Sequence, residues 1–119
     1  MHALARSLVF AGLAAATGAL AAPRAQSAFE CGIAADMAVV AKSLAAEEVA
    51  RAKADSIMSR IYDVSSSQRG QELMKEILDA AYSGGSAAAG GSAQKFAESL
   101  YATCVKSGGD MDPVLGRKL

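Results

Sequence analysis

Residues 31–50, CGIAADMAVVAKSLAAEEVA, decide how many helices the chain can form. Apolar side chains recur in this stretch with the spacing of an amphipathic helix: Ile33, Met37, Val40 and Leu44. The heptad spacing breaks after Leu44, because Ala50, the first residue of the next stripe, lies six residues on and not seven. No glycine or proline separates the two, so one helix of about 35 residues is the alternative to a turn. The adjacent acids Glu47 and Glu48 are typical of a first helical turn and favour a new helix.

The two cysteines, Cys31 and Cys104, constrain the helix count independently. Two cysteines outside a CxxC motif usually pair in an oxidising compartment. Because they lie at the start of the first helix and near the end of the last, they meet in an up-and-down bundle only if the number of helices is even. Three helices would leave them on the order of 25 Å apart, whereas a disulfide needs Cα atoms within about 7 Å. The sequence therefore predicts a turn near Leu44 to Glu47 and an all-α fold, a small up-and-down bundle of four short helices closed by one disulfide.

The first helix has two unusual features. Cys31 is out of phase with the face of Ile33 and Met37, so we expect the helix to deviate at its start, where Gly32 permits it. Small residues also surround this helix almost completely: Ala35, Ala38, Ala41, Ala45 and Ala46. Such a surface allows close helix approach or leaves a shallow apolar groove. Apolar surface that a thin bundle cannot bury would favour a partner or a second copy of the chain.

Three further segments show helical periodicity. The stripe of the second helix consists of Ala50, Ala54, Ile57, Ile61 and Val64. The stripe of the third consists of Leu73, Ile77 and Ala81, with Met74 and Leu78 beside it. The stripe of the fourth consists of Ala93, Ala97, Leu100 and Cys104, joined by Phe96. The methionines on these helices, Met37, Met58 and Met74, are expected to fill gaps in the core.

Polar and glycine residues mark the helix boundaries. Ser65, followed three residues later by Gln68, predicts a capping box for the third helix. Residues 83–92, SGGSAAAGGS, have the composition of a flexible linker, and Ser92 is a candidate N-cap for the fourth helix. Gly108 and Gly109 are expected to end that helix.

The N-terminus has the pattern of a secretory signal peptide. Residues 7–22, SLVFAGLAAATGALAA, carry no charge, and their 16 residues fall short of the roughly 20 that span a bilayer as a helix. Small-x-small sequences place cleavage between residues 21 and 28, so no stable membrane anchor is expected to remain. We therefore expect a signal peptide over 1–28, a helical domain over 29–107 and a disordered tail over 108–119. The localisation that follows is periplasmic or secreted.

The composition argues against most catalytic chemistries. The only histidine is His2, inside the predicted signal peptide, and pairing of Cys31 with Cys104 leaves no thiolate. Histidine bases, histidine or thiolate metal ligands and cysteine nucleophiles are therefore lost together. We predict no catalytic residues, no metal and no cofactor, and hence no enzyme. From Phe29 onward, ten Lys/Arg stand against twelve Asp/Glu, interspersed, so no nucleic-acid partner is expected either.

The remaining polar candidates have ordinary interpretations. Glu72, Glu76 and Asp79 share one face of the third helix and are expected to form a solvated face, an acidic metal patch being the alternative. Asp110 and Asp112 are too few for a calcium loop. The tyrosines are expected at the edge of the core, with a tyrosine-lined pocket as the alternative: Tyr62, Tyr82 and Tyr101.

In size, export signal and long-range disulfide, the chain resembles small periplasmic helical proteins, including acid-stress chaperones. The resemblance is one of layout and assigns no role to any residue. The leading hypothesis is a non-catalytic binding or interaction protein of the bacterial cell envelope, whose partner is another envelope protein or the chain itself and whose ligand-binding residues are unassigned. The alternatives are a periplasmic stress or chaperone-like protein, and an enzyme that uses carboxylates or tyrosine alone, with Glu72, Glu76, Tyr82 or Tyr101 around a concave site.

Overall fold

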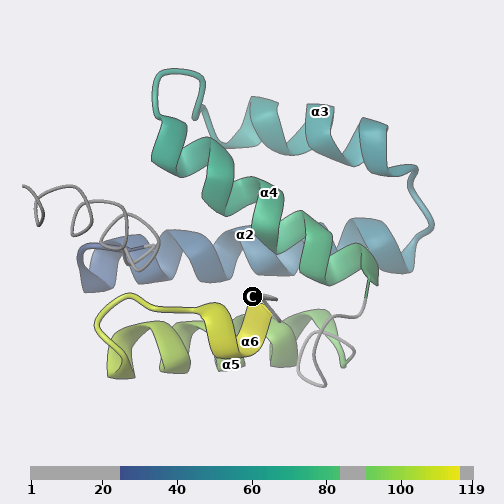
Figure 1. The fold of residues 1–119 in the computed structure, drawn as a ribbon. Coiled ribbons are helices and arrows are strands. Elements are labelled where there is room, and N and C mark those ends of the chain that lie inside the picture. Colours follow the sequence, from purple (N-terminus) through teal and green to yellow (C-terminus); the bar gives the residue numbers. More distant parts are fainter. Residues whose placement is uncertain (1–24, 84–90, 116–119) are drawn as a thin grey trace, which may run out of the picture.

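The computed structural model describes residues 25–83 and 91–115, and within them it contains helices and no strand. The helices are α2 (Ala28–Ala46), α3 (Arg51–Ile61), α4 (Gln68–Ser83), α5 (Ala93–Lys106) and the single turn α6 (Asp112–Leu115). The four longer helices run in alternating directions, with α2 in the middle, α3 and α4 on one side of it and α5 on the other (Figure 1). The predicted all-α up-and-down bundle is confirmed. Residues 1–24, which hold most of the predicted signal peptide, and most of the predicted linker lie outside the described residues.

The disulfide joins the two ends of the bundle as predicted. Cys31, in the first turn of α2, and Cys104, near the end of α5, have Cα atoms 5.7 Å apart and are linked by a disulfide. The bond closes a loop with a sequence separation of 73 residues. In the chain-entropy model, a closed loop of this length stabilises the fold by about 4 kcal/mol.

The buried face of α2 differs from the predicted one. It consists of Cys31, Ala34, Met37, Ala38 and Ala41. These positions share the phase of Cys31, so no deviation of the helix at Gly32 is needed. Of the predicted stripe only Met37 is buried, and Ile33, Val40 and Leu44 are half-buried at the edge of the core. The physical reason is that alanine lets α5, the main neighbour of α2, approach closely, while the larger residues fill the wider space beside α3 and α4.

The second stripe was also wrong in part. Ala54 and Met58 are the buried residues of α3. Ile57 and Val64 are half-buried, whereas Ile61 is 54% exposed. Because only one edge of α3 packs against α2 and α4, its buried face is narrow and consists of two residues. The third and fourth stripes are confirmed by burial of Leu73, Ile77, Phe96 and Leu100.

The turn predicted near Leu44 to Glu47 is confirmed, and it begins at Glu47, the C-cap of α2. After Ala46 the chain turns at Glu48, whose φ of 60° lies in the left-handed region. The Glu48 amide donates to the Ala45 carbonyl and the Val49 amide to the Leu44 carbonyl, the two bonds of a Schellman motif. Glycine usually occupies the left-handed position of this motif, which explains why the sequence carries no obvious stop signal here.

Two serines cap the later helices. Ser67, not Ser65, caps α4, because its hydroxyl accepts a hydrogen bond from the Gly70 amide at 2.9 Å. Ser65 precedes the helix, and its carbonyl accepts from the side chain of Gln71. Ser92 caps α5 as predicted, accepting from the Lys95 amide.

The segment after α5 is packed, contrary to the disordered tail expected over 108–119. Gly108 and Gly109 end α5 as predicted, both with positive φ. Beyond them the chain folds back so that α6 contacts both α5 and α4. The side chains that fill the space between those helices are Met111, Val114 and Leu115, all buried. Their spacing of three and one is a helical signal within a segment rich in Gly and Asp. Residues 116–119 of the predicted tail lie outside the described residues.

Candidate binding groove

A groove lies where the start of α2, the loop after α3 and the start of α4 meet. We call it the α2–α4 groove. Its volume is about 160 Å³, and its lining residues are Glu30, Ile33, Met37, Val64, Ser67, Arg69, Gly70 and Leu73. Aliphatic side chains supply most of this lining. The groove is smaller than the roughly 300–1,000 Å³ typical of small-molecule sites, so it fits a single side chain or ring better than a larger ligand.

One ion pair stands at the rim of the groove. The two terminal nitrogens of the Arg69 guanidinium, Nη1 and Nη2, donate to the Glu30 carboxylate oxygens Oε1 and Oε2, at 3.0 and 3.1 Å. The hydrogen bond from Arg69 lowers the pKa of Glu30 and, reciprocally, raises the pKa of Arg69. Both side chains are partly exposed, so the pair stabilises the fold by at most about 1 kcal/mol. It joins α2 to α4 across the groove without sealing it.

Helix caps at both walls position this pair. The Ser27 hydroxyl accepts from the Glu30 amide at 3.2 Å, and the Glu30 carboxylate accepts from the Gln26 amide at 2.9 Å. This arrangement is a variant of the capping box in which the carboxylate accepts from the residue before the N-cap, and it fixes Glu30 in the first turn of α2. Ser67 fixes the first turn of α4 in the same way, which places Arg69 opposite. Ser27 and Glu30 have the spacing of a capping box in the sequence. This pattern was not recognised, because Ser27 was assigned to the predicted signal peptide over 1–28.

A glycine makes room for one wall. A Cβ on Gly70 would come within 3.0 Å of Val64 Cγ1 and 3.2 Å of the Ser67 hydroxyl oxygen. A Cβ at residue 70 would push these two side chains away by a few tenths of an ångström, so the glycine allows the loop that carries Val64 to lie close to α4. This close contact brings Val64 to the groove.

A tyrosine holds the same loop against α2. The Tyr62 hydroxyl donates to Asp36 Oδ2 at 2.6 Å. Burial, together with this hydrogen bond to a carboxylate, raises the pKa of Tyr62 far above its ordinary value, so the hydroxyl stays protonated. Tyr62 is half-buried, in agreement with its predicted place at the edge of the core.

The most exposed large apolar side chain in the described residues stands beside the groove. Phe29 is 76% exposed and precedes Ile33, a lining residue, by four positions on α2. Residues four apart on a helix lie on the same face with Cβ atoms about 5–6 Å apart. The side chain of Phe29 is therefore a neighbour of Ile33 on the surface of α2, outside the lining of the groove. No sequence pattern singled out Phe29, which is the first residue of the predicted domain.

The predicted acidic face of α4 is partly tied up in ion pairs. Asp79 Oδ1 accepts from Arg51 Nη1 at 2.8 Å, and Asp79 Oδ2 lies 3.3 Å from Lys75 Nζ. Partial burial acts to raise the pKa of Asp79, but the hydrogen bonds from Arg51 and Lys75 outweigh it and the pKa is lowered. The pairing fastens α3 to α4 and is structural in character.

The tyrosine at the end of α4 belongs to the same contact. The Arg51 guanidinium lies 5.9 Å from the ring centre of Tyr82, and the Tyr82 hydroxyl donates to the Val49 carbonyl at 2.7 Å. The pKa of Tyr82 is raised, chiefly by burial. Tyr82 thus packs at the edge of the core with its hydroxyl engaged, as predicted.

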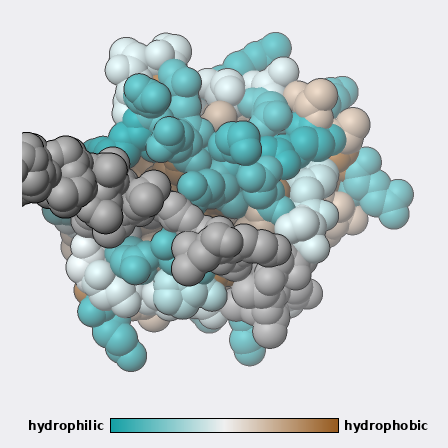
Figure 2. Space-filling model, in the orientation of Figure 1, coloured by the Kyte–Doolittle hydropathy of each residue, from teal (hydrophilic) through white to brown (hydrophobic). Residues whose placement is uncertain are grey.

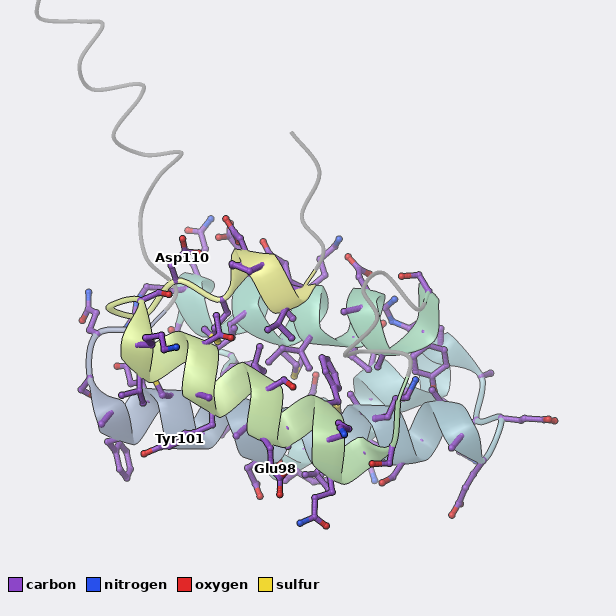
Figure 3. All side chains as sticks on the ribbon, turned by 90° about the horizontal axis from the view of Figure 1, so that it is seen from below. Glu98, Tyr101 and Asp110 are labelled. Atoms are coloured by element: carbon purple, nitrogen blue, oxygen red, sulfur yellow. A yellow bond between two sulfur atoms is a disulfide. The ribbon has the colours of Figure 1, made fainter. Side chains whose placement is uncertain are left out.

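The residues suggested for carboxylate or tyrosine chemistry are not gathered in the groove. Glu72 is exposed on α4, and Tyr101 is exposed on α5. In Figure 3, Tyr101 and Glu98 lie along one edge of α5, whereas Asp110 lies on the opposite side, ahead of α6. In the part of Figure 2 that is not grey, hydrophilic residues occupy much of the surface.

Two further hollows have mixed linings. One, of about 220 Å³, lies at the disulfide between residues 26–31 and 104–109. The other, of about 340 Å³, lies between α3 and α4 and includes Asp55, Ser59 and Gln71. None of Glu72, Glu76, Tyr82 and Tyr101 lines either hollow or the α2–α4 groove.

Two searches of the described residues bear on metal and membrane binding. Across residues 25–83 and 91–115, no three His, Cys, Asp or Glu side chains are grouped so that they could hold a metal ion. Over the same ranges, no helix has the length and apolar character needed to cross a membrane.

Comparison with known proteins provides no relative to reason from. No protein-family model, no curated protein and no solved structure matches the chain significantly. The function is therefore inferred from the residues of this chain.

Proposed function

We propose that this protein is a small, non-catalytic binding protein of the bacterial cell envelope that recognises an apolar side chain or ring through the α2–α4 groove. The observation that carries the proposal is the groove itself, an apolar hollow of about 160 Å³ open to the surface. Apolar cavities of about 150 Å³ bind benzene, so the volume suits one aromatic ring. The non-catalytic part rests on the composition, in which the single histidine is His2.

Binding of a simple aromatic probe tests the proposal. Benzyl alcohol titrated into the ¹⁵N-labelled protein should shift the amide resonances of Val64, Gly70 and Leu73 in a saturable manner. Filling the groove from inside with Ile33→Phe should abolish these shifts. Val105→Ser, which removes an exposed apolar side chain of α5, is the matched control and should leave them unchanged. Absent or uniformly distributed shifts would refute the groove as a binding site.

Export is the second part of the proposal, and the disulfide supports it because such bonds persist in oxidising compartments. Two contacts of the fold favour a cleavage site near the N-terminal end of the predicted range of 21 to 28. Ala25 is buried and its amide donates to the Gly109 carbonyl at 3.2 Å, while Ser27 caps α2. Cleavage after Ala28 would remove both contacts, so we expect it on the N-terminal side of Ala25, in keeping with the small-x-small sequence that ends at Ala21.

Intact-mass measurement on protein from the envelope fraction tests this part. The expected mass corresponds to a processed chain that begins at or before Ala25 and gains two hydrogen atoms on reduction. A first residue after Ala25, or an unprocessed chain in the cytoplasm, would contradict it.

A further inference from the structure

Phe29 has the largest exposed fraction, 76%, among the large apolar side chains of the described residues. A phenyl ring carries a large apolar area, so burial of this ring against a partner would be favourable. Phe29 lies in the first turn of α2, which the Ser27 cap and the Glu30–Arg69 pair hold in place. The backbone that carries the ring is therefore held in place, and aromatic side chains, Phe among them, are enriched in the cores of protein interfaces.

The groove that would receive such a ring lies on the same face. Ile33 is one helical turn from Phe29 and Met37 two turns, about 6 and 12 Å along the axis, and both line the α2–α4 groove. Ring and groove are thus neighbours. Two copies related by a two-fold axis between them can each insert a ring into the other, which is the arrangement of an isologous dimer.

Volume and charge both agree with this arrangement. The groove holds about 160 Å³, which matches the roughly 150 Å³ that accommodates a benzene ring. The carboxylate of Glu30 and the guanidinium of Arg69 at the rim pair with each other within the chain, so this pair sets no net charge against an incoming ring. Residues 29–119 carry twelve acids against ten bases, a balance that does not oppose association.

We infer that the occupant of the α2–α4 groove is Phe29 of a second copy of this chain, so that the protein associates through a reciprocal exchange of rings. The inference rests on the proposed binding role of the groove and names its partner. Because each side contributes one ring and the residues around it, the dimer forms reversibly and depends on concentration.

Sedimentation velocity on the oxidised protein over a wide concentration range tests the inference. The wild-type protein should show a monomer–dimer equilibrium. Phe29→Ser should weaken the dimer about a hundredfold, because each dimer contains the contact twice and a groove-filling ring contributes at least about tenfold on each side. Val105→Ser, with a side chain that is 48% exposed before substitution, should leave the dimer unchanged.

A mixing experiment separates ring exchange from general stickiness. Ile33→Phe fills the groove but keeps Phe29, and it should form a poor dimer with itself. Mixed with Phe29→Ser, which keeps an open groove, it restores one ring-in-groove contact, so the heterodimer should be tighter than either homodimer. Circular dichroism and the intact disulfide verify that each variant is folded.

The outcomes distinguish this inference from the proposed function. A monomer at every concentration, equal effects of Phe29→Ser and Val105→Ser, or no gain on mixing would overturn ring exchange. If the monomer still binds benzyl alcohol in the groove, the groove proposal stands and its occupant is a different protein. If neither dimer nor probe binding is observed, both proposals fail.

Discussion

The two sides of α2 are built in opposite ways. Toward α5 it presents Ala34, Ala38 and Ala41, each fully buried, and the disulfide joins the helices covalently. Toward the loop after α3 and the start of α4 it presents Ile33 and Met37, and there a groove remains that only an exposed ion pair spans. Small residues let one side close completely, whereas large residues at the edge of the core leave the other side open. The closed side gives stability, and the open side is where we propose that binding occurs.

Removal of the disulfide should have the largest effect, because it acts on the closed side. Cys31→Ala with Cys104→Ala should lower the free energy of unfolding by about 4 kcal/mol, since the unfolded chain regains the entropy of a long loop. Urea denaturation of the variant and of the oxidised wild type provides the measurement. Reduced wild-type protein should behave like the double variant. A denaturation midpoint that does not change would show that packing alone closes this side.

Enlarging side chains should separate the two sides directly. Ala38→Leu places extra carbons in a fully packed interface, and overpacking there should cost about 3 kcal/mol. Ile33→Phe adds a similar bulk on the open side and should cost less than about 1 kcal/mol, because the groove accepts it. Thermal melts measure the loss of stability of each variant relative to the wild type. Equal losses of stability would mean that the groove is not open to an added ring.

The glycine pair after α5 tests how tightly the closed end is packed. Gly109→Ala should cost about 2 kcal/mol, because its φ is 102° and a Cβ would collide with the Ala25 carbonyl oxygen. Gly108→Ala is the matched control, since it also has a positive φ but meets no neighbouring atom. It should cost about 1 kcal/mol. If both variants lost the same stability in urea, the contact with Ala25 would contribute nothing.

Acid should act on the open side with the smallest effect. The pKa of Glu30 is lowered in the folded protein, mainly by the hydrogen bond from Arg69. Its stabilising contribution is therefore complete above the ordinary carboxyl pKa of about 4.3 and is lost as the pH falls through the lower folded-state value. Glu30→Gln should flatten the pH dependence of the melting temperature in that acidic range. Glu72→Gln, on exposed α4 surface, controls for the loss of one charge. Identical pH profiles for wild type and Glu30→Gln would mean that the rim pair contributes no stability.

Most of the architecture could be read from local pattern combined with one covalent constraint. The period of Leu73, Ile77 and Ala81 fixed α4, and Ser92 fixed the start of α5. The requirement that Cys31 meet Cys104 gave an even number of helices and hence a turn that no glycine marks. That turn was found by chain geometry, because Glu48 adopts a left-handed conformation that its residue type does not announce.

What the sequence alone could not determine is which side of α2 faces inward. Alanine is only weakly apolar, so the predicted buried face followed the larger residues Ile33, Val40 and Leu44. The buried face in the structure contains the alanines instead: Ala34, Ala38 and Ala41. Only the tertiary structure decides this, because burial depends on how closely α5 can approach and not on the hydrophobicity of single residues. The same limit hid α6, Phe29 and the groove. Met111, Val114 and Leu115 are buried only because α4 and α5 leave space between them. The α2–α4 groove likewise forms only when the loop after α3 packs against the first turns of α2 and α4.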